Sequence, residues 1–148
     1  MSKPLLRLTW SDFDESVRYL AAQIERDGKP EIVVGIPRGG LPLAVALSHY
    51  LDVPFHAASS KLSYALIADK DIIIIDDISD TGQELRQQLL YADRFGCTDV
   101  RTAVMVERVG TVQSATYSWK YLSEDDGWII FPWERFDEVG KQKEVGSR

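Results

Sequence analysis

The sequence contains little cysteine and histidine, which excludes several classes of protein. Among its 148 residues there are one cysteine, Cys97, and two histidines, His49 and His56. One cysteine cannot form an internal disulfide, and the three residues have no zinc-ligand spacing, so we interpret all of them as packing residues. A disulfide-stabilised secreted domain and a zinc module are excluded, and we expect a chain that works in the reducing cytoplasm.

The sequence also lacks basic clusters and long hydrophobic runs. Its 17 Lys and Arg residues are scattered among 23 acidic residues, which gives a net charge of −6. The field of such a chain repels polyanions, so we expect no nucleic-acid partner. No apolar run approaches the ~20 residues of a membrane-spanning helix, and residues 1–7 contain no secretory hydrophobic segment, so we expect neither a membrane partner nor export.

What is present is the composition of one folded domain. Apolar residues make up 45% and charged residues 27% of the chain, which is typical of globular proteins. A chain of this length buries about two-thirds of its unfolded surface in a single core. We predict one domain over residues 1–134 and a polar, mobile tail over residues 135–148.

Helical and strand patterns alternate along the domain. Helical spacing predicts helices at residues 9–27 and 41–51 and after Gly82. Strands are predicted at residues 32–36, 53–58, 72–75, 100–106, 117–122 and 128–131. The runs at 32–36 and 72–75 are apolar throughout, which is typical of strands buried on both faces. We therefore predict an α/β fold with a mostly parallel twisted sheet flanked by helices.

Two turns follow these buried strands, at the edge of the sheet where parallel α/β proteins bind ligands. One is formed by residues 37–40. In the other, Asp76 and Asp77 precede Ser79-Asp80-Thr81-Gly82-Gln83, a loop that opens directly into a helix. Backbone N–H groups and hydroxyls at a helix start bind phosphate, while carboxylates bind sugar hydroxyls or a hydrated Mg2+. The pattern indicates a sugar-phosphate site, and a strand-ending turn with an ordinary helix N-cap is the alternative.

Three motifs give the sequence a specific resemblance to a known family. Residues 73–82 resemble the phosphoribosyl pyrophosphate signature of type I phosphoribosyltransferases, and residues 35–41 resemble the pyrophosphate loop of that family. Residues 128–134 resemble the base-binding hood of the xanthine/guanine (hypoxanthine) purine enzymes. The resemblance spans residues 8–134 and implies the type I phosphoribosyltransferase fold with a small C-terminal hood, contributed mainly by residues 107–134.

The resemblance implies an enzyme, a Mg2+-dependent purine phosphoribosyltransferase. It would transfer ribose 5-phosphate from phosphoribosyl pyrophosphate to a purine base such as xanthine, guanine or hypoxanthine, with release of pyrophosphate. Many relatives are dimers or tetramers, so a homo-oligomer is expected. A non-catalytic nucleotide-binding or regulatory protein of the same fold is the alternative, because a fold does not by itself establish activity.

The resemblance also implies a role for each matching residue. The donor would be bound by Arg38, Gly39, Asp76, Asp77, Ser79, Asp80, Thr81, Gly82 and Gln83. Asp77 would also lie close to the metal, and Asp80 would act as the general base near N7 of the purine. In the family, the pair that matches Arg38-Gly39 binds pyrophosphate, often through a non-proline cis peptide. The base would meet the ring of Trp128, the backbone near Ile129, and Glu107 or Arg108.

The sequence departs from the family pattern at three places. Gln83 and Glu84 stand where the phosphate loop usually ends in Gly and Thr or Ser, and a Glu84 carboxylate facing the phosphate would weaken donor binding, so we expect it to point away. Glu107-Arg108 stands where xanthine/guanine enzymes place a Lys that meets the purine 6-oxo group. Arg108 could replace that Lys, whereas Glu107 facing the base would favour an amino group. Residues 59–69, in the region of the family's flexible catalytic loop, form a short segment.

Overall fold

The computed structural model describes residues 5–134, so the tail expected at residues 135–148 lies outside the described residues. In chain order the elements are β1 (Leu5–Arg7), α1 (Trp10–Asp27), β2 (Ile32–Gly35), α2 (Leu41–Leu51), β3 (Phe55–Ala57), the 3-10 helix η1 (Lys61–Ile67), β4 (Asp71–Ser79), α3 (Gln83–Arg94), β5 (Thr98–Arg108), β6 (Tyr117–Leu122) and β7 (Trp128–Ile130). No helix within residues 5–134 is long and apolar enough to cross a membrane.

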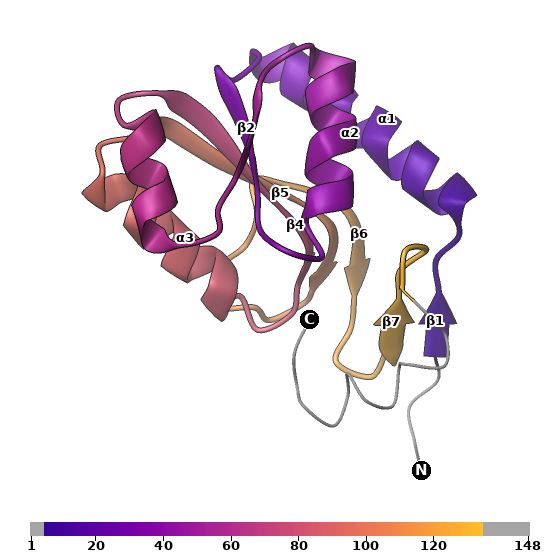
Figure 1. The fold of residues 1–148 in the computed structure, drawn as a ribbon. Helices are drawn as coiled ribbons and strands as arrows, with labels where there is room; N and C mark the ends of the chain where they lie inside the picture. Colours follow the sequence, from indigo (N-terminus) through magenta and orange to yellow (C-terminus); the bar gives the residue numbers. More distant parts are fainter. Residues whose placement is uncertain (1–4, 135–148) are drawn as a thin grey trace.

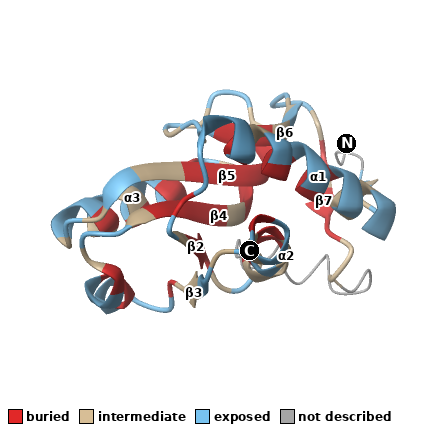
Figure 2. Cartoon of the chain, turned by 90° about the horizontal axis from the view of Figure 1, so that it is seen from above, coloured by how far each residue is buried: buried red, intermediate tan, exposed pale blue. Residues whose placement is uncertain are grey.

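A five-stranded parallel sheet forms the centre of the structure, in the order β3-β2-β4-β5-β6 (Figure 1). Alternate side chains of β4 enter two different cores. Ile73 and Ile75 pack with α1 and α2, whereas Ile72 and Ile74 pack with α3 and η1. Figure 2 shows β4 and β5 as a buried centre, with exposed helix surfaces outside them. The predicted α/β fold, with a mostly parallel sheet flanked by helices, is confirmed.

A capping box at the start of α1 and a glycine after α3 set these helix ends close to the predicted positions. The Oγ1 atom of Thr9 accepts the Asp12 N–H at 3.0 Å, and the Asp12 carboxylate accepts the Thr9 N–H at 2.8 Å. This reciprocal capping box satisfies two N–H groups at the start of α1. After α3 the chain turns at Gly96, where a φ of 79° favours glycine.

β4 is longer than predicted, which changes the setting of the acidic pair. The apolar run predicted a strand that ends at Ile75, with both aspartates in the following turn. The strand continues to Ser79 because β5 pairs with it as far as Glu107. Successive side chains of a strand point to opposite faces, so Asp76 and Asp77 present their carboxylates on different sides of β4.

A second, two-stranded sheet joins the two ends of the described chain. β1 pairs in parallel with β7, with Leu5 opposite Trp128, and Figure 1 shows the two strands beside each other at one end of the structure. The sequence did not predict β1, because three residues carry no periodic signal and the strand depends on its partner. Beside this sheet, the rings of Phe131 and Trp133 stack at 5.1 Å, and Trp133 also contacts Phe13 of α1.

Candidate functional site

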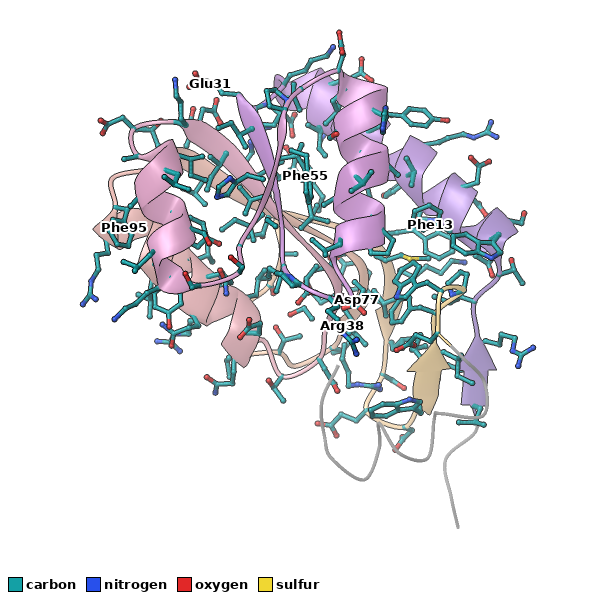
Figure 3. The ribbon with its side chains drawn as sticks, in the orientation of Figure 1. Phe13, Glu31, Arg38, Phe55, Asp77 and Phe95 are labelled. Carbon is teal, nitrogen blue, oxygen red and sulfur yellow. The ribbon has the colours of Figure 1, made fainter. Side chains whose placement is uncertain are left out.

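A cavity of about 400 Å³ opens at the carboxyl end of β4. Seven of the nine residues predicted to bind the donor line it: Asp76, Asp77, Ser79, Asp80, Thr81, Gly82 and Gln83. The other two, Arg38 and Gly39, follow Pro37, which also lines the cavity. Figure 3 shows Arg38 and Asp77 at this end of the central sheet. The structure therefore gathers both predicted turns around one space.

The loop after β2 packs directly against β4, and glycine makes this approach possible. A Cβ atom on Gly39 would lie 2.2 Å from Oδ2 of Asp77, and one on Gly40 would lie 2.6 Å from the carbonyl oxygen of Ile75. Any larger side chain at these positions would force the loop away from the strand. A non-proline cis peptide is present between Pro37 and Arg38, one residue before the Arg38–Gly39 bond at which we expected it.

The acidic pair at the end of β4 is held by the backbone. Oδ1 of Asp76 accepts the N–H of Asp77 at 2.9 Å, and Oδ1 of Asp77 accepts the N–H of Ile78 at 2.8 Å. Burial and the nearby Asp77 charge raise the pKa of Asp76 well above its ordinary value. A ligand that brings hydroxyl donors or a cation would relieve this repulsion, as a sugar or a metal ion does.

The loop of residues 79–83, where we predicted the phosphate site and which we call the cradle, connects β4 to α3. Gly82 adopts a φ of 89°, and Oγ1 of Thr81 accepts the N–H of Gln83 at 3.2 Å, so the first turn of α3 faces the cavity. These N–H groups and the helix dipole favour an anion at this end of the helix. The hydroxyl of Ser79, which we expected at the phosphate, donates to the carbonyl oxygen of Gln113 at 3.3 Å.

Sequence reasoning missed the support under this cradle, which comes from residues 109–116. The N–H of Val112 donates to the carbonyl oxygen of Thr81 at 2.8 Å. A Cβ atom on Gly82 would lie 2.7 Å from the backbone nitrogen of Gln113, so the two segments are in close contact. No motif marks this loop, because its contacts are made through the main chain.

Glu84, the main departure from the family pattern, is tied to its own helix. Its Oε1 atom accepts the side-chain N–H of Gln88 at 3.2 Å, and Oε1 of Gln88 accepts the hydroxyl of Tyr64 at 2.5 Å. Tyr64 belongs to η1 and is fully buried, and this burial raises its pKa. Glu84 lines the cavity, and its carboxylate is bonded to Gln88, which lies one turn further along α3.

Arg108 joins the cradle to the hood, residues 107–134. Its Nε donates to Oδ1 of Asp80 at 2.7 Å. Its Nη1 donates to the carbonyl oxygens of Ser123 at 2.9 Å and Asp126 at 3.1 Å, and its Nη2 to that of Gly127 at 3.3 Å. The Arg108 side chain is only 17% exposed. One cation thus contacts the predicted general base and the segment that leads into Trp128.

The other predicted base-binding residues lie in the hood, outside the wall of the cavity. Glu107 is 6% exposed, and its Oε1 atom accepts the N–H of Ala115 at 2.7 Å and the hydroxyl of Ser118 at 3.1 Å. Trp128 is half-buried on β7, and the side chain of Ile129 is buried in the core. The contacts of Glu107 support the hood, and its role at the base stays a prediction.

Comparison with known proteins identifies the family. Residues 9–65 and 57–135 match the model described as the phosphoribosyl transferase domain. The chain belongs to the phosphoribosyltransferase family. The matched residues contain both turns of the cavity and the whole hood.

Individual relatives of this chain include purine enzymes and regulators. The xanthine-guanine phosphoribosyltransferase of Cereibacter sphaeroides is 28% identical, with 86% of this chain and 85% of that enzyme covered. The crystal structure of a purine phosphoribosyltransferase from Pyrococcus horikoshii is 29% identical with a TM-score of 0.76, over 89% of this chain and 95% of that one. The transcriptional regulator GfcR of Methanococcus vannielii is 30% identical over 87 residues, 49% of this chain. The matched part spans only 40% of that regulator.

Proposed function

We propose that this phosphoribosyltransferase transfers ribose 5-phosphate from phosphoribosyl pyrophosphate to a purine base, with xanthine, guanine or hypoxanthine as the acceptor. The observation that carries the proposal is the cavity at the carboxyl end of β4. It combines an anion-binding helix start with an acidic pair and with the loop that packs against Asp77 through Gly39. A phosphorylated sugar that carries a second anionic group matches these three features.

The donor would bind with its 5-phosphate on the cradle, residues 79–83. The N–H groups at the start of α3 would hold the phosphate oxygens. The carboxylates of Asp76 and Asp77 would accept hydrogen bonds from the ribose hydroxyls. Pyrophosphate would lie on residues 37–40, where Gly39 lets the loop pack against Asp77 and Arg38 adds a permanent positive charge.

The acidic pair also fits a Mg2+ ion that arrives with the donor. Mg2+ in proteins is usually held by one or two carboxylates together with waters and substrate phosphates. Residues 5–134 contain no group of three or more His, Cys, Asp or Glu side chains that could hold a metal ion, so further ligands would come from the donor. Asp77 is the residue that we assign to the metal. When bound, Mg2+ would neutralise charge on the departing pyrophosphate.

Transfer breaks the bond between the anomeric carbon and pyrophosphate, and positive charge develops on the ribose. The carboxylates of Asp76 and Asp77 would offset that charge, and the guanidinium of Arg38 would stabilise the leaving group. Asp80 would accept a proton from the attacking base or hold the base in the reactive tautomer. Trp128 would stack on the purine ring, and the backbone near Ile129 would bind the edge of the base.

The proposal is tested by following pyrophosphate release from the purified chain with phosphoribosyl pyrophosphate, Mg2+ and a panel of purine and pyrimidine bases. We expect release that requires donor, base and metal together, and that stops on addition of EDTA. The Asp76→Asn/Asp77→Asn double variant serves as the inactive control, because it keeps the size of both side chains. Absence of release with every purine would refute the proposal.

A regulatory nucleotide-binding protein is the second candidate. Two observations favour it: the similarity to archaeal transcriptional regulators, and the Glu84 carboxylate beside the cradle. Calorimetry with purine nucleotides and with the donor separates the two functions. Tight nucleotide binding without pyrophosphate release from any base would support the regulator.

A further inference from the structure

The guanidinium of Arg108 lies between two parts of the site that come from distant parts of the sequence. We propose that Arg108 is a positioning residue that fixes the hood and Asp80 relative to each other, and that base orientation depends on this link. The kinetic effects that we predict for this link rest on the proposed function. The positioning role also differs from the direct contact with the purine 6-oxo group that the family resemblance implied for Arg108.

The geometry of the contacts suits a guanidinium and no other side chain. Arg108 uses Nε for Asp80, Nη1 for two carbonyl oxygens and Nη2 for a third. These acceptors bond to different edges of a planar group with five N–H donors, so the rigid guanidinium holds residue 80 and residues 123–127 at a fixed distance from each other. A lysine has a single nitrogen and cannot reach Asp80 and residues 123–127 together in this arrangement.

The hood segment that Arg108 contacts, residues 123–127, contains a turn with hydrogen bonds of its own. The carboxylate of Asp126 accepts the N–H of Ser123 at 2.8 Å and the Ser123 hydroxyl at 3.3 Å, which closes a turn of four residues. This turn can therefore form without Arg108. What Arg108 adds is the placement of the turn relative to Asp80, which lies 28 residues earlier in the chain.

The two ends of this link lead to two residues that we propose act on the base. Gly127, whose carbonyl oxygen accepts from Nη2, directly precedes Trp128, the proposed stacking ring. Asp80, which accepts from Nε, is the proposed general base. Displacements of about 1 Å in such a site cost on the order of 100-fold in rate. Arg108 would therefore affect base binding and turnover more than donor binding.

Arg108→Lys is the direct test, with Arg101→Lys as a matched control. Arg101 is also on β5 and is 19% exposed, but it contacts Asp71 and the hydroxyl of Tyr117, away from the cavity. For Arg108→Lys we expect a rise in KM for the base and a fall in kcat of about tenfold each, with the donor Kd changed less than about twofold. For Arg101→Lys we expect no change in KM for the base, in kcat or in the donor Kd. An equal loss in both variants would overturn the proposal, because it would reflect a general loss of stability.

Chemical rescue supplies a readout that a purely structural defect would not give. Millimolar guanidinium ion should restore part of kcat to Arg108→Gly, because the ion can occupy the vacated position between Asp80 and the carbonyl oxygens. The same ion should not raise the kcat of Arg101→Gly. Failure of rescue, together with unchanged kinetics of Arg108→Lys, would sink the proposal.

Hydrogen exchange separates failure of this inference from failure of the proposed function. In Arg108→Lys, amides of residues 123–127 and 80–82 should exchange faster than in the parent, whether or not any base is turned over. Where Arg108→Lys does not fold, Asp80→Ala serves instead, because it removes the acceptor of Nε. Unchanged exchange at residues 123–127 and at residues 80–82 would refute the positioning role of Arg108, even if the enzyme is active.

Discussion

The donor cradle and the hood lie next to each other but are assembled in different ways. The cradle is a continuous stretch at the end of β4 and the start of α3, and its shape depends on backbone groups and close approaches at Gly39 and Gly82. The hood combines β6 and β7 with β1 from the start of the chain, and Arg108 connects it to Asp80. The difference teaches that donor binding depends on close main-chain approaches around one loop, whereas base binding depends on a side-chain link between the hood and Asp80.

Asp80→Asn should have the largest effect, and it separates chemistry from positioning. The amide oxygen can still accept from Nε of Arg108, so the link to the hood is kept while the proton acceptor is lost. We expect kcat to fall by about 10²- to 10⁴-fold while the donor Kd stays nearly unchanged. Single-turnover kinetics and donor calorimetry measure the two quantities, and unchanged turnover would refute the role of Asp80 as a base.

Gly39→Ala tests whether the cradle side depends on close backbone packing. The added methyl would lie 2.2 Å from Oδ2 of Asp77, so the loop or the carboxylate must move. We expect donor affinity to fall by about 100-fold. Gly28→Ala is the control, because it imposes backbone strain at a φ of 109° with no neighbour within 4 Å. Similar donor affinity in both variants would contradict the close-packing argument.

Trp128→Ala tests the hood side of the comparison. Loss of the stacking ring should raise KM for the base by about 10- to 100-fold, in line with the ~1–3 kcal/mol of base–aromatic stacking. Donor affinity should remain that of the parent, because Trp128 does not line the donor cavity. Trp119→Ala serves as the control, since Trp119 packs on the core. A matching change in donor affinity would show that the two regions are not separable.

The two regions also differ in how far the sequence predicts them. The strand and helix patterns and the motifs at residues 35–41 and 73–82 predicted the fold and the meeting of two turns at one cavity. The sequence did not predict β1, the continuation of β4 to Ser79, or the support from residues 109–116. These features depend on pairing between distant segments or on main-chain groups, which leave no pattern in side-chain identity. The contacts of Arg108 with three carbonyl oxygens were hidden for the same reason.

Glu84→Gln should have the smallest effect, and it tests whether the cradle tolerates its acidic neighbour. The amide oxygen can still accept from Gln88, so the variant removes charge and keeps the contact. Glu84 is exposed, and water screens its repulsion of a bound phosphate, so we expect donor affinity to rise by no more than about fivefold. Glu15→Gln, on the exposed face of α1, makes the same change in net charge away from the cavity.

A large gain in donor affinity from Glu84→Gln would mean that the Glu84 carboxylate faces the phosphate when the donor binds. A small gain would mean that Gln88 keeps the charge away, which would also weaken one of the two grounds for a regulatory protein.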